Sequence, residues 1–268
     1  MPLLLLLFFF LFPDRLMAED KNHLLSDLQE HQGNYIIRNQ FQDPDQGLPY
    51  LAHELKVQFS FKKRIWSGLH FAYSQRLFWQ VFDGDHSRPM REVNYNPEFF
   101  WDLQDSYIEL IRLGLWEHES NGEELGYDEE GNEVNASRSW NRVYLTIGED
   151  FWDGAFHSRL KLWQVTDRED NEYTSFFEDN RDIQQYLGHG ELDLRWKGSW
   201  GRAELMLRKG WMAGTETGRL QIHIPFSLLF GPEAPQVEVM LYGFSGYGES
   251  LIDYNRKLER WGIGFSFN

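Results

Sequence analysis

Residues 137–147 read Ser-Arg-Ser-Trp-Asn-Arg-Val-Tyr-Leu-Thr-Ile, and this stretch decides the fold class. Successive side chains of a β-strand point to opposite faces, so residues two apart share a face. Here one face is apolar beyond Asn141, and the other is charged or amphipathic. The apolar row is Val143, Leu145 and Ile147, and the opposite row is Arg138, Trp140, Arg142 and Tyr144. Such a strand fits between lipid and a polar interior, although a soluble sandwich has a similar period.

Further stretches of similar length are also rich in aromatic and β-branched residues, and polar turns separate them. Closed bacterial barrels have an even number of strands, so we predict an all-β fold, a transmembrane antiparallel β-barrel of about 12 strands. The expected strands are Asn34–Gln42, Glu54–Lys63, Leu69–Phe82, Glu92–Leu103, Ser106–His118, Ser137–Ile147, Phe156–Val165, Ile183–Trp196, Arg202–Lys209, Gly218–Pro225, Gln236–Phe244 and Leu258–Phe267.

The connections between these stretches differ in length. Trp196–Gly201 contains Lys-Gly-Ser and predicts a tight hairpin turn. Three other connections are long and acidic, namely Phe82–Arg91, Glu119–Ala136 and Asp167–Arg181. Outer-membrane barrels have short turns on the periplasmic side and longer loops outside. We therefore expect the long acidic connections to lie outside the cell.

The composition agrees with a barrel and excludes other classes. Aromatic residues make up 16% of the 268 residues, which suits strands that meet a lipid boundary. The negative mean hydropathy argues against a bundle of membrane helices but not against a barrel, whose two faces cancel in an average. A net charge of -16 argues against binding to nucleic acid. The chain has no cysteine, so disulfides contribute nothing to its stability.

The N-terminus has the pattern of a targeting segment. Met1–Phe12 is almost wholly apolar, which is too short to span a bilayer as a helix but suits the apolar core of a signal peptide. Ala18 stands where cleavage could occur. We predict a signal peptide over residues 1–18 and one transmembrane barrel domain over 19–268. A buried or interfacial N-terminal helix is the alternative for the first segment.

Three polar residues could form a catalytic group. His118 and Ser120 are two apart, so on a strand they share a face. If the next strand is antiparallel, Asn141 can lie beside His118 and accept a hydrogen bond from one ring nitrogen. A nucleophile, a base and an orienting residue would then be assembled. A histidine and a serine at this spacing also occur by chance, and a surface histidine at a strand end is the alternative.

The face of the His118 strand is ambiguous. Ile108, Leu110 and Trp116 share the parity of His118, but so does Arg112. Ile111, Leu113 and Leu115 are apolar on the opposite parity. A β-bulge in this strand would reconcile the two patterns, but the sequence leaves the question open.

Several motifs resemble those of the outer-membrane phospholipase A family. The family has His-x-Ser-Asn-Gly, which matches residues 118–122, followed by Ser-Arg-Ser-Trp-Asn-Arg, which matches residues 137–142. Residues 91–97, Arg-Glu-Val-Asn-Tyr-Asn-Pro, and residues 245–255, Ser-Gly-Tyr-Gly-Glu-Ser-Leu-Ile-Asp-Tyr-Asn, resemble two more of its segments. The matching segments run in the family's order from about Lys56 to Phe267, most of the expected mature chain.

The resemblance implies a twelve-stranded barrel in the bacterial outer membrane, with the catalytic group on its lipid-facing exterior. It also implies that Ser120 attacks an acyl ester of a phospholipid, that His118 transfers the proton and that Asn141 orients His118. The implied activity is a phospholipase of the A1/A2 and lysophospholipase type.

The resemblance further implies a calcium cofactor and a reversible homodimer with calcium ligands from both subunits. The positions that match calcium-associated residues are Ser137 and Ser87, and Gln75 matches a polar residue in the dimer interface. A glutamine that faces the lumen is the alternative for Gln75. The loop from Ser120 to Ser137 is longer and more acidic than in the family, and the family's calcium aspartate has no aligned counterpart. Asp128 and Glu133 are the candidates to replace it.

Two other functions fit parts of these observations. A passive outer-membrane pore or structural barrel would carry the three polar residues without using them and would conduct ions. A soluble extracellular esterase would use them without a membrane. The number and length of the expected strands argue against the second.

Overall fold

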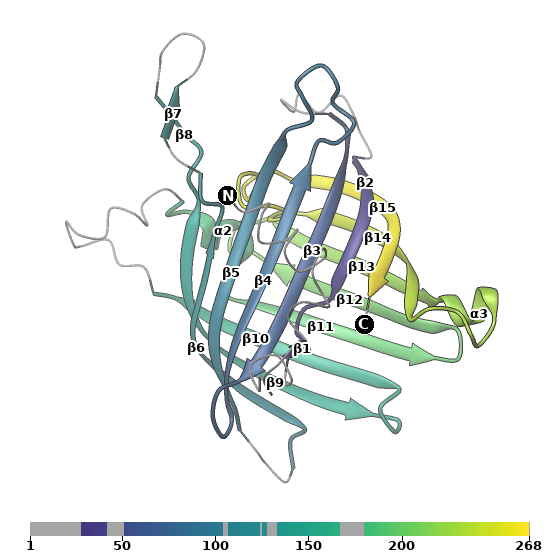
Figure 1. Ribbon diagram of the computed structural model, residues 1–268. Helices are drawn as coiled ribbons and strands as arrows, with labels where there is room; N and C mark the ends of the chain where they lie inside the picture. The colour runs from purple at the N-terminus through teal and green to yellow at the C-terminus, as the bar shows by residue number, and fades with distance from the viewer. Residues whose placement is uncertain are drawn as a thin grey trace, which may run out of the picture.

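The computed structural model describes residues 28–41, 51–103, 107–123, 125–127, 133–166 and 180–267 (Figure 1). The predicted signal peptide over residues 1–18 lies outside the described residues. Within the described part, neither helix is long and apolar enough to cross a membrane.

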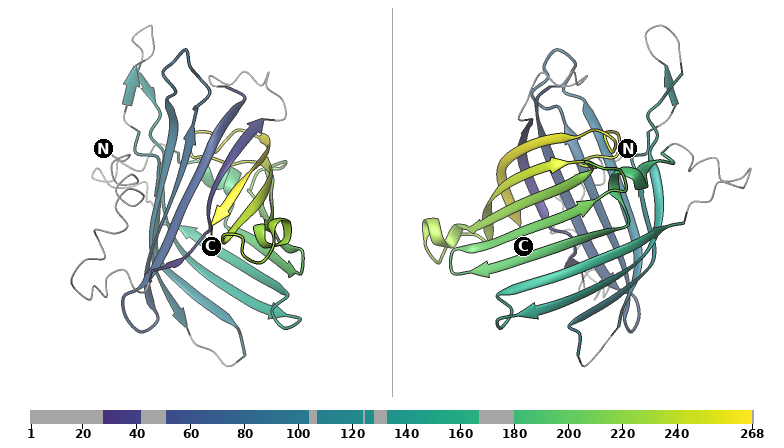
Figure 2. Two further views of the ribbon diagram at one scale, coloured as in Figure 1. Left: turned by 45° about the vertical axis from the view of Figure 1, so that its right-hand side comes forward. Right: turned by 180° about the vertical axis from the view of Figure 1, so that it is seen from behind.

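Twelve antiparallel strands form a closed ring. Neighbouring strands in the chain pair in turn, β15 pairs with β2, and the ring therefore has no free edge (Figures 1 and 2). The strands are β2 (Asn34–Phe41), β3 (His53–Arg64), β4 (Leu69–Trp79), β5 (Met90–Leu103), β6 (Leu110–Ser120), β9 (Ser139–Phe151), β10 (Phe156–Val165), β11 (Gly190–Gly198), β12 (Gly201–Lys209), β13 (Glu216–Pro225), β14 (Val237–Gly246) and β15 (Leu258–Phe267).

In the part of the chain that the structure describes, five short elements lie outside this ring. β1 (Leu28–Glu30) pairs with the end of β3. β7 (Leu125–Tyr127) and β8 (Glu133–Asn135) form a hairpin between β6 and β9. The helices are α2 (Ile183–Leu187) and α3 (Phe226–Phe230).

The predicted twelve-stranded barrel is confirmed, but one of its expected strands is wrong in part. Ile183–Trp196 was expected to be continuous, whereas its first residues form α2 and β11 begins only at Gly190. Ile183 and Leu187 are both buried and lie four apart, which is the spacing of one helix face. Gly188 has a φ of 67° and ends the helix, because glycine adopts this left-handed conformation without strain.

The two ends of the barrel differ. β4, β6 and β10 all end at the same rim, so the three long acidic connections start there, and the β7–β8 hairpin lies beyond it (Figure 1). The opposite rim has short turns, including the predicted hairpin in which Gly198 pairs with Gly201. The exception is the β13–β14 connection, which contains α3. Short turns face the periplasm in outer-membrane barrels, so the rim with the long connections faces outward.

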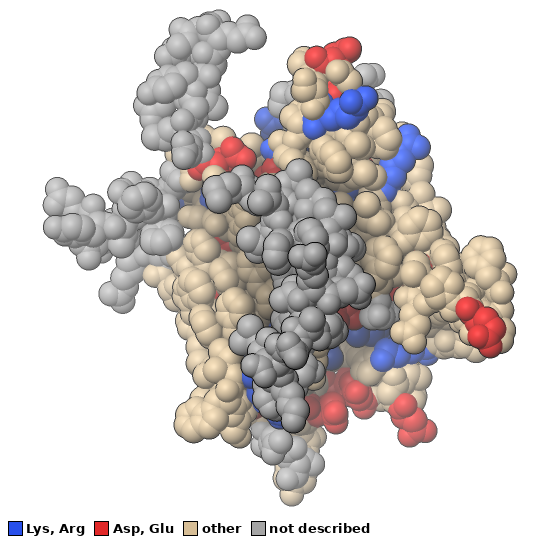
Figure 3. Space-filling view, in the orientation of Figure 1, with Lys and Arg blue, Asp and Glu red and all other residues tan. Residues whose placement is uncertain are grey.

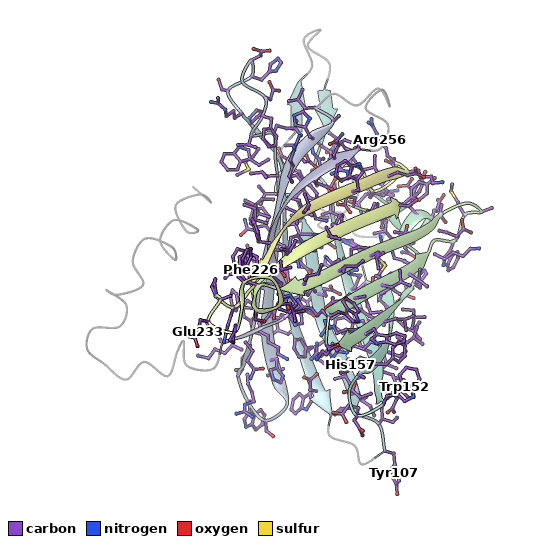
Figure 4. The ribbon with its side chains drawn as sticks, turned by 90° about the vertical axis from the view of Figure 1, so that its right-hand side faces the viewer. Tyr107, Trp152, His157, Phe226, Glu233 and Arg256 are labelled. Carbon is purple, nitrogen blue, oxygen red and sulfur yellow. The ribbon has the colours of Figure 1, made fainter. Side chains whose placement is uncertain are left out.

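The outer surface of the barrel wall is apolar. Exposed side chains on the outward faces of neighbouring strands are mostly aliphatic or aromatic, and charged side chains gather mainly toward the ends on the face seen in Figure 3. Aromatic rings cluster at the rim with short turns, where Trp152 lies 5.9 Å from Trp196 and 5.6 Å from Phe156 between ring centroids. Figure 4 labels Trp152 and Tyr107 at this rim. An aromatic girdle of this kind marks a membrane–water interface.

Charged and polar side chains fill the interior instead. Glu54 accepts two hydrogen bonds from Arg91, at 2.9 and 3.1 Å, and pairs with Arg260. Lys56 donates to Glu249 at 2.8 Å. An apolar exterior around a charged interior is the reverse of the pattern in a soluble sandwich. The fold therefore excludes the alternative of a soluble esterase. The cavity that remains inside the barrel is lined by charged side chains, among them Lys56, Arg142 and Glu249.

One of these pairs attaches the connection after β14 to the inside of the barrel at the outward end. Glu249 lies in the connection after β14, outside the strands, and reaches Lys56 and the Tyr242 hydroxyl, which donates to it at 2.7 Å. Burial opposes ionisation of Glu249, but the charges of Lys56 and Arg260 outweigh it and lower the pKa of this carboxyl to about 2. Glu249 is therefore ionised at neutral pH and holds the connection inside the barrel.

A charge placed at mid-depth on the outer wall should destabilise the barrel. Leu160 lies near the middle of β10 and is 43% exposed. We expect Leu160→Arg to lower the free energy of unfolding by about 2–4 kcal/mol and Leu228→Arg, in α3 at the rim, by about 0–1 kcal/mol, since the cost of a buried charge falls toward the interface. Denaturant unfolding in lipid vesicles, followed by tryptophan fluorescence, measures both. Equal losses would contradict the assignment of the lipid-facing wall.

Candidate active site

A β-bulge in β6 determines which residues of that strand face outward. Phe99 of β5 pairs with Trp116 and Phe100 pairs with Gly114, so Leu115 is an extra residue. Leu115 and Trp116 are 50% and 39% exposed, although they are adjacent in the chain. The open question of the sequence is thereby resolved, because the parity of β6 changes at the bulge.

Beyond the bulge, His118 and Ser120 both point outward. Their inward neighbours Glu117 and Glu119 are buried in the lumen. Before the bulge the outward residues are Ile111 and Leu113, which explains the apolar residues on both parities. One extra residue thus moves the polar pair to the lipid-facing side.

β9 places Asn141 beside His118. The two strands are antiparallel neighbours in which His118 pairs with Asn141 and Ser120 pairs with Ser139. The His118 Nδ1 atom lies 2.9 Å from the Asn141 Oδ1 atom. Asn141 shares its outward face with Val143 and Ile147, as the alternation of this strand predicts. The structure therefore brings together a base and a group that can orient it, with the Ser120 hydroxyl two residues along the same face.

The trio lies at the outward edge of the apolar wall. Asn141 stands ten residues before Phe151, which ends β9 at the rim with short turns. With about 3.3 Å per residue and a tilt of about 40°, this separation corresponds to about 25 Å of height, the thickness of the apolar band. The three side chains thus lie where the acyl region of the outer leaflet meets its headgroups.

Trp116 also contacts the trio. Its Nε1 atom donates to the same Asn141 Oδ1 atom at 3.1 Å. Its ring is stacked against the His118 ring, with 5.9 Å between centroids and 6° between planes. Trp116 shares the parity of His118 in the sequence, but the sequence pattern alone predicts no role for it. Trp116 and His118 are two residues apart on one strand, and this spacing is the sequence signal that could have indicated the contact.

Ion pairs hold the lumenal side of the same strand segment. Arg142 donates to Glu117 at 2.8 Å and to Glu119 at 3.3 Å, and Lys161 donates to Glu117 at 3.0 Å. Glu119 also accepts from Trp140 Nε1 at 3.0 Å. These contacts join β6 to β9 and β10 directly behind His118 and Ser120. Buried charge pairs of this kind restrict the backbone geometry, because breaking one leaves an unpaired charge.

Asn121 closes the base of the loop that follows. It is 2% exposed, its amide nitrogen donates to the Ala136 carbonyl at 2.8 Å, and its amide oxygen accepts from the Arg138 backbone N–H at 2.9 Å. Ser137 is held between these two contacts, near the start of β9. Its own carbonyl accepts a hydrogen bond from the Arg138 guanidinium at 2.6 Å.

The other two expected calcium positions, Ser87 and Asp128, belong to two different connections. Ser87 lies in the β4–β5 connection with a φ of 62°, and Asp128 lies outside the described residues. In the described segments, no group of three or more His, Asp or Glu side chains could hold a metal ion. Ser87 and Ser137 offer oxygen atoms, the donor type that calcium takes, but two serines alone fall short of the six to eight oxygens it requires.

Gln75 points outward rather than into the lumen, so the lumenal alternative is wrong. It pairs with Phe59 on β3 and with Tyr95 on β5. Its Oε1 atom accepts a hydrogen bond from the Tyr73 hydroxyl at 3.2 Å. Gln75 is 6% exposed and sits among aromatic side chains.

Comparisons with known proteins identify the family to which the chain belongs. Its residues 15–267 match the family model described as Phospholipase A1. Phospholipase A1 of Escherichia coli strain K12 is 30% identical over 224 residues, covering 80% of this chain and 70% of that protein. A putative phospholipase A1 of Neisseria meningitidis serogroup B is 31% identical over 231 residues, covering 80% of this chain and 54% of that protein.

Solved structures give the same result. Outer membrane phospholipase A of Escherichia coli superposes with a TM-score of 0.72 at 27% identity, covering 90% of this chain and 98% of that one. A dimer of the Salmonella typhi outer membrane phospholipase with bound calcium superposes with a TM-score of 0.74 at 26% identity, covering 94% and 95%. With these relatives and its lipid-facing barrel, the protein is located in the bacterial outer membrane. The chain belongs to the phospholipase A1 family, a family of carboxylic ester hydrolases.

Proposed function

We propose that this protein is a calcium-dependent phospholipase that hydrolyses acyl ester bonds of membrane phospholipids, of the A1/A2 and lysophospholipase type. Ser120 is the nucleophile, His118 the general base and Asn141 the residue that orients it. The observation that carries the proposal is the 2.9 Å contact between His118 Nδ1 and Asn141 Oδ1 on the outward face that also carries Ser120.

The proposed chemistry depends on which nitrogen of the His118 ring carries the proton. Asn141 Oδ1 can only accept, so His118 Nδ1 carries the proton and Nε2 remains a base. Nε2 takes the Ser120 hydroxyl proton as the Oγ atom attacks the ester carbonyl carbon, and the proton passes to the departing lysolipid oxygen. Water then attacks the acyl-serine, His118 accepts its proton and returns it to Ser120, and a fatty acid leaves.

The position of the site supports a substrate within the bilayer. The trio lies about 25 Å from the rim with short turns, at the edge of the apolar band. The ester carbonyls of a phospholipid lie at the same boundary between acyl chains and headgroups. A lipid in the outer leaflet can therefore present its ester to Ser120 without leaving the membrane.

Ser120→Ala should abolish turnover without disturbing the barrel. Removal of the nucleophile is expected to lower fatty-acid release from phospholipid by at least about 1,000-fold, as loss of a triad member does in serine hydrolases. Ser158→Ala is the matched control, since Ser158 also lies on the outward face, in β10. Release is measured with purified protein in detergent and in vesicles. Equal release by Ser120→Ala and wild type would refute the assignment of Ser120.

The calcium part of the proposal rests on the kind of donor near the trio. Ser137 and Asp128 belong to the long connection that follows Ser120, where they offer a hydroxyl and a carboxylate, and Ser87 offers a second hydroxyl in the β4–β5 connection at the same rim. When bound, calcium would stabilise the developing negative charge on the ester oxygen. That help is needed because the amide of Asn141 is neutral and stabilises a protonated His118 less than a carboxylate would. Since one chain offers too few donors, we propose that two copies share the site.

A homodimer would form through the outward faces of β3, β4 and β5. Gln75 lies at the centre of these strands, between Phe59 and Tyr95. An amide in hydrocarbon is costly unless it is hydrogen-bonded. The Tyr73 hydroxyl donates a hydrogen bond to the side-chain oxygen of Gln75. Among the described residues, the side-chain nitrogen of Gln75 has no hydrogen-bond partner. A second copy could provide one across the interface.

Calcium removal should lower activity and dimer content together. We expect a calcium chelator to reduce fatty-acid release at least tenfold, added calcium to restore it, and magnesium to fail because it demands a smaller octahedral site. Chemical crosslinking under the same conditions measures the dimer, and Gln75→Leu should lower the crosslinked fraction. Full activity in the chelator would refute the calcium requirement but leave Ser120, His118 and Asn141 in their roles.

A further inference from the structure

The amide of Asn141 could face His118 in either of two ways. Its oxygen and nitrogen ends have nearly the same shape, but the oxygen accepts and the nitrogen donates. With the nitrogen toward His118, Nδ1 would have to accept, and the ring proton would move to Nε2. His118 would then have no free base to take a proton from Ser120. Something in the structure must therefore select the oxygen end.

Trp116 makes that selection possible. An indole nitrogen donates and never accepts, and Trp116 Nε1 lies 3.1 Å from the Asn141 oxygen, which is also 2.9 Å from His118 Nδ1. Turning the amide over would place its NH2 group against the indole N–H. Asn141 is only 8% exposed, and a donor held against another donor leaves both without a hydrogen bond. The oxygen-inward arrangement is therefore favoured by two hydrogen bonds together.

The ring of Trp116 adds a second restraint. It is stacked 5.9 Å from the His118 ring with 6° between the planes. This packing holds the imidazole in the plane in which Nδ1 meets Asn141. The bulge at Leu115 makes the contact possible, because it places Trp116 on the outward face beside His118.

We propose that Trp116 is a positioning residue that fixes the amide orientation of Asn141 and, through it, the tautomer of His118. This inference rests on the proposed function and adds a residue to it. It separates two roles of Trp116: the indole N–H selects the amide orientation, and the ring packs against the imidazole.

Trp116→Phe tests the first role, because phenylalanine keeps a stacked ring and removes the donor. We expect kcat for fatty-acid release to fall about tenfold with little change in KM, the size of one lost hydrogen bond. The same change is then made beside Asn141→Asp. Both oxygens of a carboxylate can accept a hydrogen bond from His118 Nδ1, so either orientation of the introduced carboxylate would keep the proton on that nitrogen. Trp116→Phe should therefore change kcat by less than about twofold in that background.

The outcomes separate a positioning role from packing. An equal loss in both backgrounds would overturn the proposal, since packing acts whatever residue occupies position 141. Unchanged kcat in Trp116→Phe alone would overturn it as well. If Asn141→Asp turns over too slowly, the rate at which a fluorophosphonate labels Ser120 gives the same comparison. The proposed function fails separately, if Ser120→Ala remains active.

A second, independent inference concerns α3. Its sequence Phe-Ser-Leu-Leu-Phe carries no charge, and Leu228, Leu229 and Phe230 are 53%, 53% and 71% exposed. The helix replaces a short turn at the periplasmic rim and stands out from the barrel wall (Figures 1 and 2). Phe226 packs against Phe265, with 5.8 Å between centroids, and Phe265 is a lipid-facing residue of β15.

The surface of α3 is thus continuous with the lipid-facing wall. We infer that α3 inserts into the boundary between headgroups and acyl chains of the periplasmic leaflet and anchors the barrel there. An apolar helix at this depth gains free energy by burying Leu228, Leu229 and Phe230 in lipid. The next acidic residue, Glu233, lies three positions beyond the helix, where the chain can return to water.

The absence of cysteine from the chain makes the test direct. Phe230→Cys and, as matched control, Glu233→Cys each carry one environment-sensitive fluorophore in vesicles that contain lipids with a quencher on the acyl chain. We expect at least threefold stronger quenching at 230 than at 233. Equal quenching would overturn the inference. Quenching at 230 that depends on the protein-to-lipid ratio would instead assign the surface to a second copy and overturn it too.

Discussion

The absence of hydrogen-bond partners in lipid is the constraint on which this structure depends. Every backbone N–H and C=O in the bilayer must pair within the protein, and a sheet can achieve this only by closing. The pairing of β15 with β2 completes that closure. Once the ring is closed, alternate residues must face lipid or lumen, so the wall is apolar outside and the charges of Glu54, Lys56 and Arg260 lie inside in pairs.

The same alternation makes the proposed catalytic group on the outer wall difficult to build. A regular β6 would place either its apolar residues or its polar residues outward along its whole length. Leu115 removes this restriction, because one extra residue allows Leu113 and His118 to face the same side. The ion pairs of Glu117 and Glu119 then hold the reversed segment from within. The bulge thus belongs to the site as much as to the fold.

The sequence predicted what depends on short-range periodicity. β9 alternates without interruption, so the outward face of Asn141 followed from it, and the twelve strands followed from the repeated aromatic stretches between polar turns. The face of His118 could not be decided, because a bulge is defined by the register with Phe99 and Phe100 on another strand. Ile183–Leu187 was misread because Ile183 and Leu187 also have helical spacing. The direction of Gln75 likewise depended on its neighbours, since β4 is aromatic on both faces.

Lipid also explains the choice of asparagine at position 141. An unpaired carboxylate on the outer wall would have to be desolvated, whereas a neutral amide tolerates this position. The amide introduces an ambiguity that a carboxylate lacks, because only one of its ends can accept from His118. Tryptophan resolves the ambiguity at low cost, since its ring suits the interface and its N–H is a donor that needs an acceptor. The Trp116–Asn141–His118 contacts are therefore one solution to a single problem, namely orienting the proposed base with a neutral partner.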